Sequence, residues 1–307
     1  QSIVREKDME SIRYLLKISK SSVYALIFIA STSYAGGNSI SSEGFTSNLY
    51  GSYTLSTGKI DWNKSSSHGG SQPQKFQYIS INGWLGKKLS SDTEAVLGGK
   101  YVYFDRAGNI TTPEDDAIRN TLHLDLLHIR HYDNSSSFLN LGYVYAEEIE
   151  SGTEDGSHNT YLASIGYATN SVVIDFGLGT SNVNLGNFTV DELIYYHLTY
   201  KKPITSKINL LISKHYSEYE SKIGSSRDGD GQSFDITGLK ITYDLPNSYL
   251  SLGGDRYDVH SADGDSKGGS YYFSWNIPFG SSSHERTKLI MDNRPAIDQV
   301  VGFGATH

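Results

Sequence analysis

The chain has 307 residues, of which 37% are hydrophobic, and its 34 acidic and 26 basic side chains give a net charge of −8 at pH 7. This charge argues against a dedicated nucleic-acid binder, which would present a basic face. The absence of cysteine excludes a disulfide framework, cysteine-ligated zinc and thiol catalysis. The 23 Tyr and 31 Gly, beside only 6 Pro and 2 Met, favour a β-rich chain because aromatic residues are enriched in strands and glycine in turns.

The N-terminal segment has the layout of a secretory signal peptide. Starting at Met9, three basic residues precede an apolar run from Val23 to Ala30 and small residues that end at Ala35. This layout predicts a start at Met9 and cleavage after Ala35, so we expect residues 1–35 to lie outside the fold and 36–44 to form a linker. The alternative interpretation is a buried amphipathic helix, since the apolar run is far shorter than the roughly 20 residues of a spanning helix.

Twelve segments with a period of two follow. Hydrophobic and polar residues alternate in most of them, as in LNLGYVY, where Leu139, Leu141, Tyr143 and Tyr145 share one phase. Such alternation predicts β-strands with one apolar and one polar face. The predicted strands are 48–59, 76–89, 93–104, 121–132, 138–146, 161–168, 172–179, 193–201, 208–216, 235–243, 249–257 and 271–279.

The connections between these segments alternate between long polar stretches and short turns. Six are long, such as GKIDWNKSSSHGGSQPQK, and five are short, such as SSD and TNS. Short periplasmic turns and longer outer loops are typical of transmembrane β-barrels. A soluble β-sandwich or periplasmic barrel could bury the same faces, but a sandwich has no reason to place every long loop at one end. The sequence therefore predicts an all-β fold, a transmembrane antiparallel up-and-down β-barrel over residues 45–279.

The last predicted strand has an unusually aromatic face. One phase carries Tyr271, Phe273, Trp275, Ile277 and Phe279, and the other phase is largely polar. With the signal peptide, the even number of strands and the loop rhythm, this strand resembles the Gram-negative outer-membrane β-barrel proteins. In that family the last strand usually carries alternating aromatic residues and a closing Phe as an assembly signal.

The resemblance implies a porin-like protein of the bacterial outer membrane. It implies contact with outer-membrane lipid and lipopolysaccharide, and recognition by the barrel-assembly machinery during insertion. The assembly signal normally ends the chain in this family, whereas here residues 280–307 follow it. We expect these residues to form a periplasmic tail, either extended or folded back into the barrel mouth.

The polar phase of the strands would face the lumen of such a barrel. A Lys or Arg in the lipid-facing phase would cost about 2–4 kcal/mol at the bilayer midplane, so the phase of charged residues is informative. About twelve strands leave room for a narrow pore. The alternative is an interior plug of salt bridges. The predicted pore-lining residues are Glu94, Lys100, His123, Asp125, Asp175, His197, His215, Lys240 and Asp255.

The stretch HLDLLHIRH places several potential metal ligands within one predicted strand. Alternation places His123, Asp125 and His131 on one face and His128 on the other, which favours polar lumen residues over a metal site. The pair Leu126 and Leu127 could mark a bulge that would turn Arg130 inward. We predict no catalytic residues, metal site or cofactor.

These patterns favour a channel that lets small hydrophilic solutes diffuse passively through a polar lumen. Interior charges would set its selectivity, but their mixed signs predict neither anion nor cation preference. The alternatives are a barrel enzyme acting on lipid or lipopolysaccharide, with a Ser or His near the rim as nucleophile or base, and a structural or adhesive barrel.

Overall fold

The computed structural model describes residues 49–64, 72–105, 117–150, 156–185, 188–219, 232–260 and 265–280. The chain divides into two units, Gln1–Leu49 and Tyr50–His307, and the fold described below belongs to the second, apart from the first residue of β1. The predicted signal peptide and linker lie outside the described residues, as does the predicted tail beyond Gly280. Among the described residues, no helix is long and apolar enough to cross a membrane.

Twelve strands account for most of the described residues. Each predicted segment coincides with one strand, so the prediction of an all-β chain is confirmed. The strands are β1 (Leu49–Lys64), β2 (Gln72–Lys88), β3 (Thr93–Asp105), β4 (Ala117–His131), β5 (Ser135–Glu150), β6 (Gly156–Thr169), β7 (Val173–Leu185), β8 (Phe188–Pro203), β9 (Ile208–Tyr219), β10 (Gln232–Leu245), β11 (Ser248–His260) and β12 (Ser266–Gly280).

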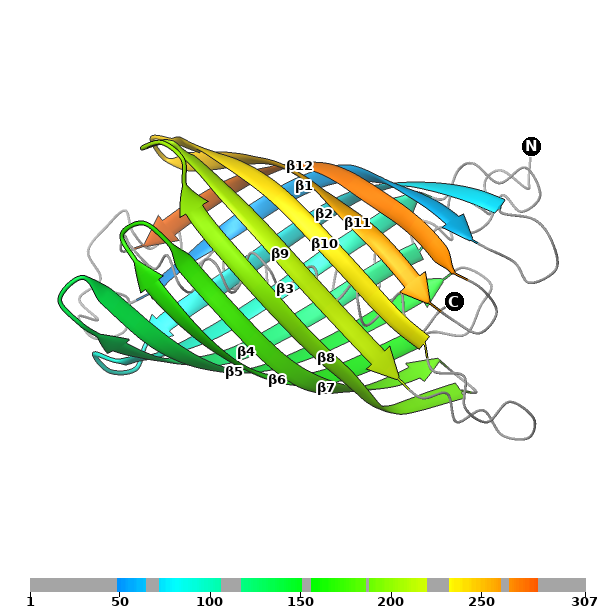
Figure 1. Ribbon diagram of the computed structural model, residues 1–307, viewed down its shortest axis with the longest axis horizontal. Helices are drawn as coiled ribbons and strands as arrows, with labels where there is room; N and C mark the ends of the chain where they lie inside the picture. The colour runs from blue at the N-terminus through cyan, green and yellow to red at the C-terminus, as the bar shows by residue number, and fades with distance from the viewer. Residues whose placement is uncertain are drawn as a thin grey trace, which may run out of the picture. The chain divides into compact units, whose positions relative to one another are not determined.

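The strands form one closed antiparallel barrel in which each strand neighbours the next along the chain. Strands β1 and β12 close it with a continuous register from Tyr50 opposite Gly280 to Asn63 opposite Lys267. Figure 1 shows the strands running obliquely around the barrel wall. Closure removes the free sheet edges, so the ladder satisfies the backbone polar groups of the wall.

The register of β4 corrects one sequence expectation. Its pairing with β3 and β5 runs through Leu127 without a shift. Leu127 is buried and Arg130 is exposed, so no bulge turns Arg130 inward. A register shift does occur in β7, between Ser181 and Val183 against β8.

Most strands are longer than their apolar segments predict. They run from 12 residues in β9 to 17 in β2, whereas about 9–11 residues span a bilayer as a tilted strand. The stretch 180–192, expected to be a long loop, is largely strand, because β7 continues to Leu185 and β8 begins at Phe188. Ladder hydrogen bonds do not require apolar side chains, so pairing continues beyond the apolar band.

Five short connections lie at one end of the barrel, which we call the turn end; the opposite end is the loop end. Two of these turns are held by a threonine hydroxyl. Thr169 Oγ1 accepts hydrogen bonds from the backbone N–H groups of Ser171 and Val172, both at 3.1 Å. Thr205 Oγ1 does the same for Lys207 and Ile208, at 3.2 and 3.1 Å. Such local hydroxyl bonds favour tight turns.

Candidate functional site

Alternate residues of each strand face the barrel interior, and the predicted pore-lining residues all have this phase. In β4, for example, His123 and Asp125 are buried while Leu122, Leu124 and Leu126 are exposed on the outside. Lys100 and Asp255 are half-buried. The other seven are buried: Glu94, His123, Asp125, Asp175, His197, His215 and Lys240.

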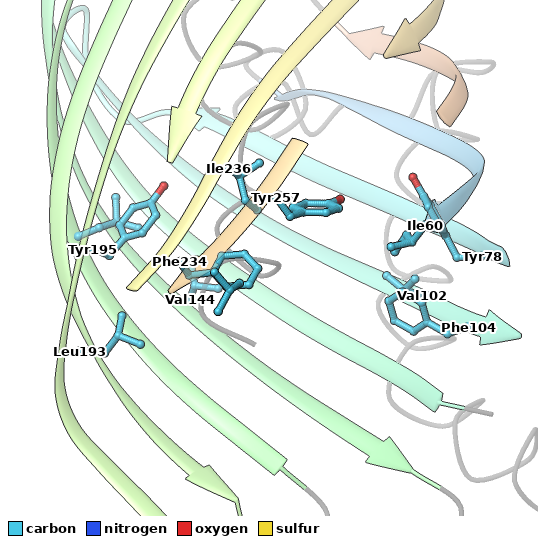
Figure 2. Packing of buried hydrophobic residues seen from close by; sticks show 12 residues of the cluster. Ile60, Tyr78, Val102, Phe104, Val144, Leu193, Tyr195, Phe234, Ile236 and Tyr257 are labelled. Atoms are coloured by element: carbon cyan, nitrogen blue, oxygen red, sulfur yellow. The ribbon is translucent and has the colours of Figure 1, made fainter. Parts of the chain in front are cut away.

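Two clusters of buried apolar side chains also lie inside the barrel. The loop-end cluster, much of which is drawn in Figure 2, comprises Ile60, Tyr78, Val102, Phe104, Val144, Leu162, Leu193, Tyr195, Phe234, Ile236, Tyr257 and Val259. The turn-end cluster comprises Tyr50, Trp84, Val96, Leu127, Ile129, Phe138, Ala168, Val173 and Leu211.

A polar belt separates the two clusters. Along β10, for example, Phe234 and Ile236 belong to the loop-end cluster, and Lys240 follows them in the same phase toward the turn end. The two clusters are largely apolar, but Arg119 and His158 are buried at the level of the loop-end cluster, and Glu94 and Asn276 at the level of the turn-end cluster. We define the polar belt as Asn82, Lys100, His123, Asp125, Asn140, Ser164, Asp175, His197, Ser213, His215, Lys240, Asp255 and Ser270.

Strands β7, β8 and β9 carry a row of interacting acid, imidazole and phenol groups. His197 Nε2 lies 2.7 Å from Asp175 Oδ2, and both side chains are nearly fully buried. The rings of His197 and His215 are 5.9 Å apart between centroids. The Tyr195 hydroxyl and His215 Nδ1 are 2.8 Å apart, within hydrogen-bond distance. The ladder explains this row, because His197 is directly opposite His215.

A second group forms around Asp255 on β11. Ser270 Oγ donates a hydrogen bond of 3.0 Å to Asp255 Oδ2, and the Tyr257 hydroxyl donates to Ser270 Oγ at 2.9 Å. Lys240 of β10 and Lys100 of β3 both interact electrostatically with the Asp255 carboxylate. Acid and base from distant parts of the sequence therefore lie close enough in the belt to influence each other electrostatically.

The remaining interior carboxylates also have partners on other strands. Asn140 Nδ2 donates a 3.0 Å hydrogen bond to Asp125 Oδ1. The Tyr50 hydroxyl of β1 donates to the Glu94 carboxylate of β3. The Tyr50 ring reaches Glu94 by lying over Gly86 of the intervening strand β2. Absence of a side chain at Gly86 is what permits this path.

Two glycines leave space for the side chains of the belt. A Cβ at Gly238 would lie 2.6 Å from both Asp255 Oδ1 and Ser213 Oγ. At Gly177 a Cβ would lie 2.9 Å from His197 Nδ1 and 2.8 Å from Ser164 Cβ. Both distances are shorter than normal contacts, so an alanine would displace the polar groups around it.

Several buried polar atoms of the belt have no hydrogen-bond partner among the described residues. They are Asn140 Oδ1, Ser164 Oγ, Asp175 Oδ1, His197 Nδ1 and His215 Nε2. Buried polar atoms are nearly always hydrogen-bonded, either to protein or to ordered water. The belt therefore offers several donors and acceptors that the described residues do not use.

The outer face of the barrel is apolar. Tyr271, Phe273 and Trp275 of β12 are exposed, and Ile277 and Phe279 are half-buried in the same outward phase. Phe279 lies over Gly51 and stacks on Tyr53 with ring centroids 5.1 Å apart. A closed ladder that exposes leucine, isoleucine and aromatic side chains is suited to hydrocarbon surroundings.

Comparison with known proteins gives matches only at the level of structure. No family model matches the chain, and no curated protein matches its sequence significantly. The chain is similar to the COG4313 outer membrane channel from Pseudomonas putida F1, with a TM-score of 0.58 and 11% identity over 76% of this chain and 96% of that one.

Two further structures match with lower TM-scores. OccAB1 from Acinetobacter baumannii gives a TM-score of 0.42 at 9% identity, over 75% of this chain and 97% of that one. A BenF-like porin from Pseudomonas fluorescens Pf-5 gives 0.39 at 8% identity, over 77% and 100%.

The fold is that of an outer-membrane β-barrel. The closed ladder, the apolar exterior and the likeness to the Pseudomonas putida channel agree on this. They confirm the predicted fold class.

The aromatic side chains of the interior were not predicted from the sequence. Tyr50, Tyr78, Trp84, Phe234 and Tyr257 are buried inside the barrel. A signal was present, because Tyr78 shares its phase with Ser80 and Asn82, and Tyr257 shares its phase with Asp255. Aromatic content alone suggested lipid contact. In this barrel, the phase of an aromatic residue within its strand shows better whether its side chain faces the interior or the outside.

The stretch HLDLLHIRH does not form a cluster of metal ligands. His123 and Asp125 are buried, whereas His131 is exposed at the turn end of β4. Within the part of the chain that the structure describes, no group of three or more His, Asp or Glu side chains is arranged to hold a metal ion.

Proposed function

We propose that this barrel is a narrow, hydrated channel through which small hydrophilic solutes diffuse passively across the outer membrane. The observation that carries the proposal is the set of unpartnered polar atoms in the belt, among them Asp175 Oδ1, His197 Nδ1 and His215 Nε2. An unsatisfied buried polar group costs about 1–3 kcal/mol. Several in one layer are tolerated where water reaches them, whereas a dry salt-bridged plug would pair them.

The solute path would cross the barrel from one end to the other and pass through the polar belt. Its lining would include eight belt residues, Lys100, His123, Asp125, Asp175, His197, His215, Lys240 and Asp255, and also Glu94, which lies outside the belt beside Tyr50 of the turn-end cluster. The loop-end and turn-end clusters would act as largely apolar constrictions on either side of the belt. Hydrophobic constrictions gate channels by controlling their wetting, and a barrel of about twelve strands leaves little spare width. We therefore expect small conductance and a sharp size limit.

Single-channel recording in planar bilayers tests this proposal. Full-length protein folded into detergent should give small, discrete conductance steps, and heat-unfolded protein from the same preparation should give none. Liposome swelling with a series of neutral sugars would then measure the size limit. Absence of conductance from correctly folded protein would overturn the channel function.

A barrel hydrolase is the second candidate, because Ser164 lies beside the buried Asp175–His197 pair. Ser164 Cβ and His197 Nδ1 both border the space over Gly177, and an acid–imidazole–serine order is the pattern of a serine nucleophile. Ser164 Oγ, however, makes no hydrogen bond to His197. Labelling of Ser164 by a serine-reactive fluorophosphonate, lost in His197→Gln, would favour the hydrolase over the channel.

We also propose partners for the outer surface of the barrel. The aromatic face of β12, from Tyr271 to Phe279, would be recognised by the barrel-assembly machinery during insertion. Lipopolysaccharide would contact the barrel near its loop end, since long loops face the cell exterior in outer-membrane barrels.

A further inference from the structure

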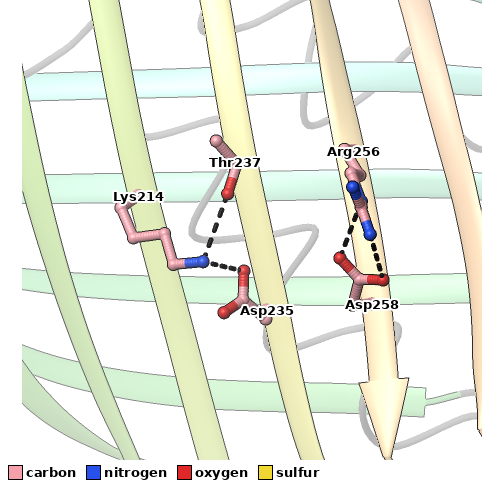
Figure 3. Close-up of polar contacts among 5 residues, drawn as sticks. All are labelled: Lys214, Asp235, Thr237, Arg256 and Asp258. Carbon is pink, nitrogen blue, oxygen red and sulfur yellow. Dashed lines mark hydrogen bonds and ion pairs between the residues drawn. The ribbon is translucent and has the colours of Figure 1, made fainter.

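Charged side chains interrupt the apolar exterior on strands β9 to β11. Lys214 Nζ donates to the Asp235 carboxylate and, at 3.2 Å, to Thr237 Oγ1. Arg256 Nε and Nη2 donate to the two oxygens of Asp258 at 2.9 and 3.1 Å. Figure 3 shows these contacts side by side across the three strands. The ladder aligns them, because Thr237 is opposite both Lys214 and Arg256.

These charges lie at the loop-side border of the apolar band. The next outward residues toward the turn end are Ile212 on β9 and Leu239 on β10, both exposed. On β8, Leu198 is directly opposite Lys214. A cation so close to lipid-facing leucine is costly unless its head group reaches a polar partner.

The cations of this surface extend farther outward than the carboxylates. The Lys214 and Arg256 side chains are 49% and 69% exposed, whereas those of Asp235 and Asp258 are 24% and 23% exposed. Lys267 of β12 is also exposed and lies opposite Asp258 in the ladder. We call Lys214, Arg256 and Lys267 the cation patch. It presents positive charge to whatever covers it.

Donor capacity remains after the intramolecular bonds are made. A guanidinium has five N–H donors and an ammonium has three. Arg256 uses two in its contacts with Asp258, and Lys214 uses two in its contacts with Asp235 and Thr237. The unused N–H groups belong to well-exposed head groups, so a second anion could share these cations.

The corresponding border on other strands has a different chemistry. On β3, β5 and β6 the outward residues toward the loop end are Tyr101, Tyr103, Tyr143, Tyr145 and Tyr161. Tyrosines at this depth form the usual interfacial girdle. Exposed outward lysines also occur toward the loop end of β1 and β2, at Lys59 and Lys75, so the patch contrasts with β3, β5 and β6 and not with the whole rim.

We propose that the cation patch is a binding site for the phosphate groups of lipopolysaccharide. Phosphates of its lipid A lie at the border between the acyl chains and the sugars of the outer leaflet, at the level expected for the patch. Arginine and lysine bind phosphate through charge-assisted hydrogen bonds. The recessed Asp235 and Asp258 hold the cations in place for this contact. The inference rests on the proposed lipopolysaccharide partnership and not on the channel function.

Native mass spectrometry of the folded full-length protein in detergent tests this site, with purified diphosphoryl lipid A and its phosphate-free form as probes. The protein should retain the diphosphoryl form preferentially. In the Lys214→Gln/Arg256→Gln variant, the preference for diphosphoryl over phosphate-free lipid A should fall about tenfold, as expected for one or two lost charge-assisted bonds. Unchanged preference in this variant would overturn the proposal.

Lys202→Gln/Lys207→Gln is the matched control, because it removes two exposed cations at the turn end. It should leave the preference intact, and an equal loss there would also overturn the site. Asp235→Asn/Asp258→Asn keeps both cations but removes the carboxylates that hold them in place, so lipid A retention should weaken; unchanged or stronger retention would contradict the proposed role of the carboxylates. A patch variant that instead changes the mass of the lipid-free protein assembly would identify the surface as a contact between copies.

Conductance separates this inference from the channel function. The patch faces outward, so Lys214→Gln/Arg256→Gln should conduct like the unaltered protein if the channel proposal holds. A protein that binds diphosphoryl lipid A but never conducts would support the patch and refute the channel.

Discussion

The ring of Phe138 in β5 lies directly over Gly166, its ladder partner in β6. The same relationship recurs on the inner wall, where Tyr78 lies over Gly58 and Tyr272 over Gly253. Glycine lacks a Cβ, so an aromatic ring lies flat against the neighbouring backbone and shields it. These rings cover the barrel wall, which leaves more of the interior cross-section open than upright rings would.

Gly166→Ala should destabilise the barrel. An added Cβ would overlap the Phe138 ring, and overpacking of this kind costs about 1–3 kcal/mol. Gly99→Ala is the control, because its nearest contact would be Thr121 O at 3.3 Å, and we expect a change within about 0.5 kcal/mol. Urea unfolding in detergent measures both. Equal stability of the two variants would contradict the packing role of Gly166.

Lys100→Gln/Lys240→Gln should shift the channel toward cations. Both lysines act on Asp255 in the belt, so their removal leaves uncompensated negative charge there. At 4 Å in a water-like medium one unit charge is worth about 1 kcal/mol, or roughly fivefold in the permeability ratio. Reversal potentials in a salt gradient measure this ratio. A shift toward anions would contradict the assigned lining.

Asp175→Asn tests whether the belt is wet or dry. In a hydrated belt, loss of this carboxylate should shift selectivity toward anions while the protein still folds, because water solvates His197. In a dry plug, removal of one partner of a buried pair typically costs about 3–5 kcal/mol and changes no conductance. Parallel unfolding and single-channel measurements distinguish the two cases.

Phe234→Ala should widen the loop-end constriction and raise the single-channel conductance. Phe234 packs beside Tyr257 in the loop-end cluster, with ring centroids 6.3 Å apart. A buried Phe→Ala change costs about 3–5 kcal/mol, so folding must be checked by heat-dependent gel mobility. Phe176→Ala, on the exposed outer face of β7, should leave conductance unchanged. No increase for a folded Phe234→Ala protein would place the narrowest point elsewhere.

Trp275→Ser/Phe279→Ser should reduce insertion into the outer membrane and leave aggregates in the periplasm. Both residues belong to the outward face of β12, which we propose as the assembly signal. Leu122→Ser/Leu124→Ser removes two exposed apolar groups from β4 and controls for lost lipid contact. Fractionation of the cell envelope measures insertion. Normal insertion of the β12 variant would refute the proposed recognition.

The sequence by itself determined the strands and the direction of their side chains. Alternation with a period of two is a property of each strand alone, so it assigned Asp175 and His197 to the interior and Tyr271 and Trp275 to the exterior. The rhythm of short and long connections predicted an up-and-down barrel, because antiparallel neighbours require only local turns. The sequence did not determine the strand ends, since ladder pairing continues into polar segments such as 180–192.

Only the tertiary structure decided which of these side chains meet. Asp175 lies beside His197, and Asp255 near both Lys240 and Lys100, because closure and register bring the strands together. The layering of the interior and the cation patch also depend on register, which aligns Lys214, Thr237 and Arg256 across three strands. Register is fixed by pairing around the whole barrel, and no single segment of the sequence contains it.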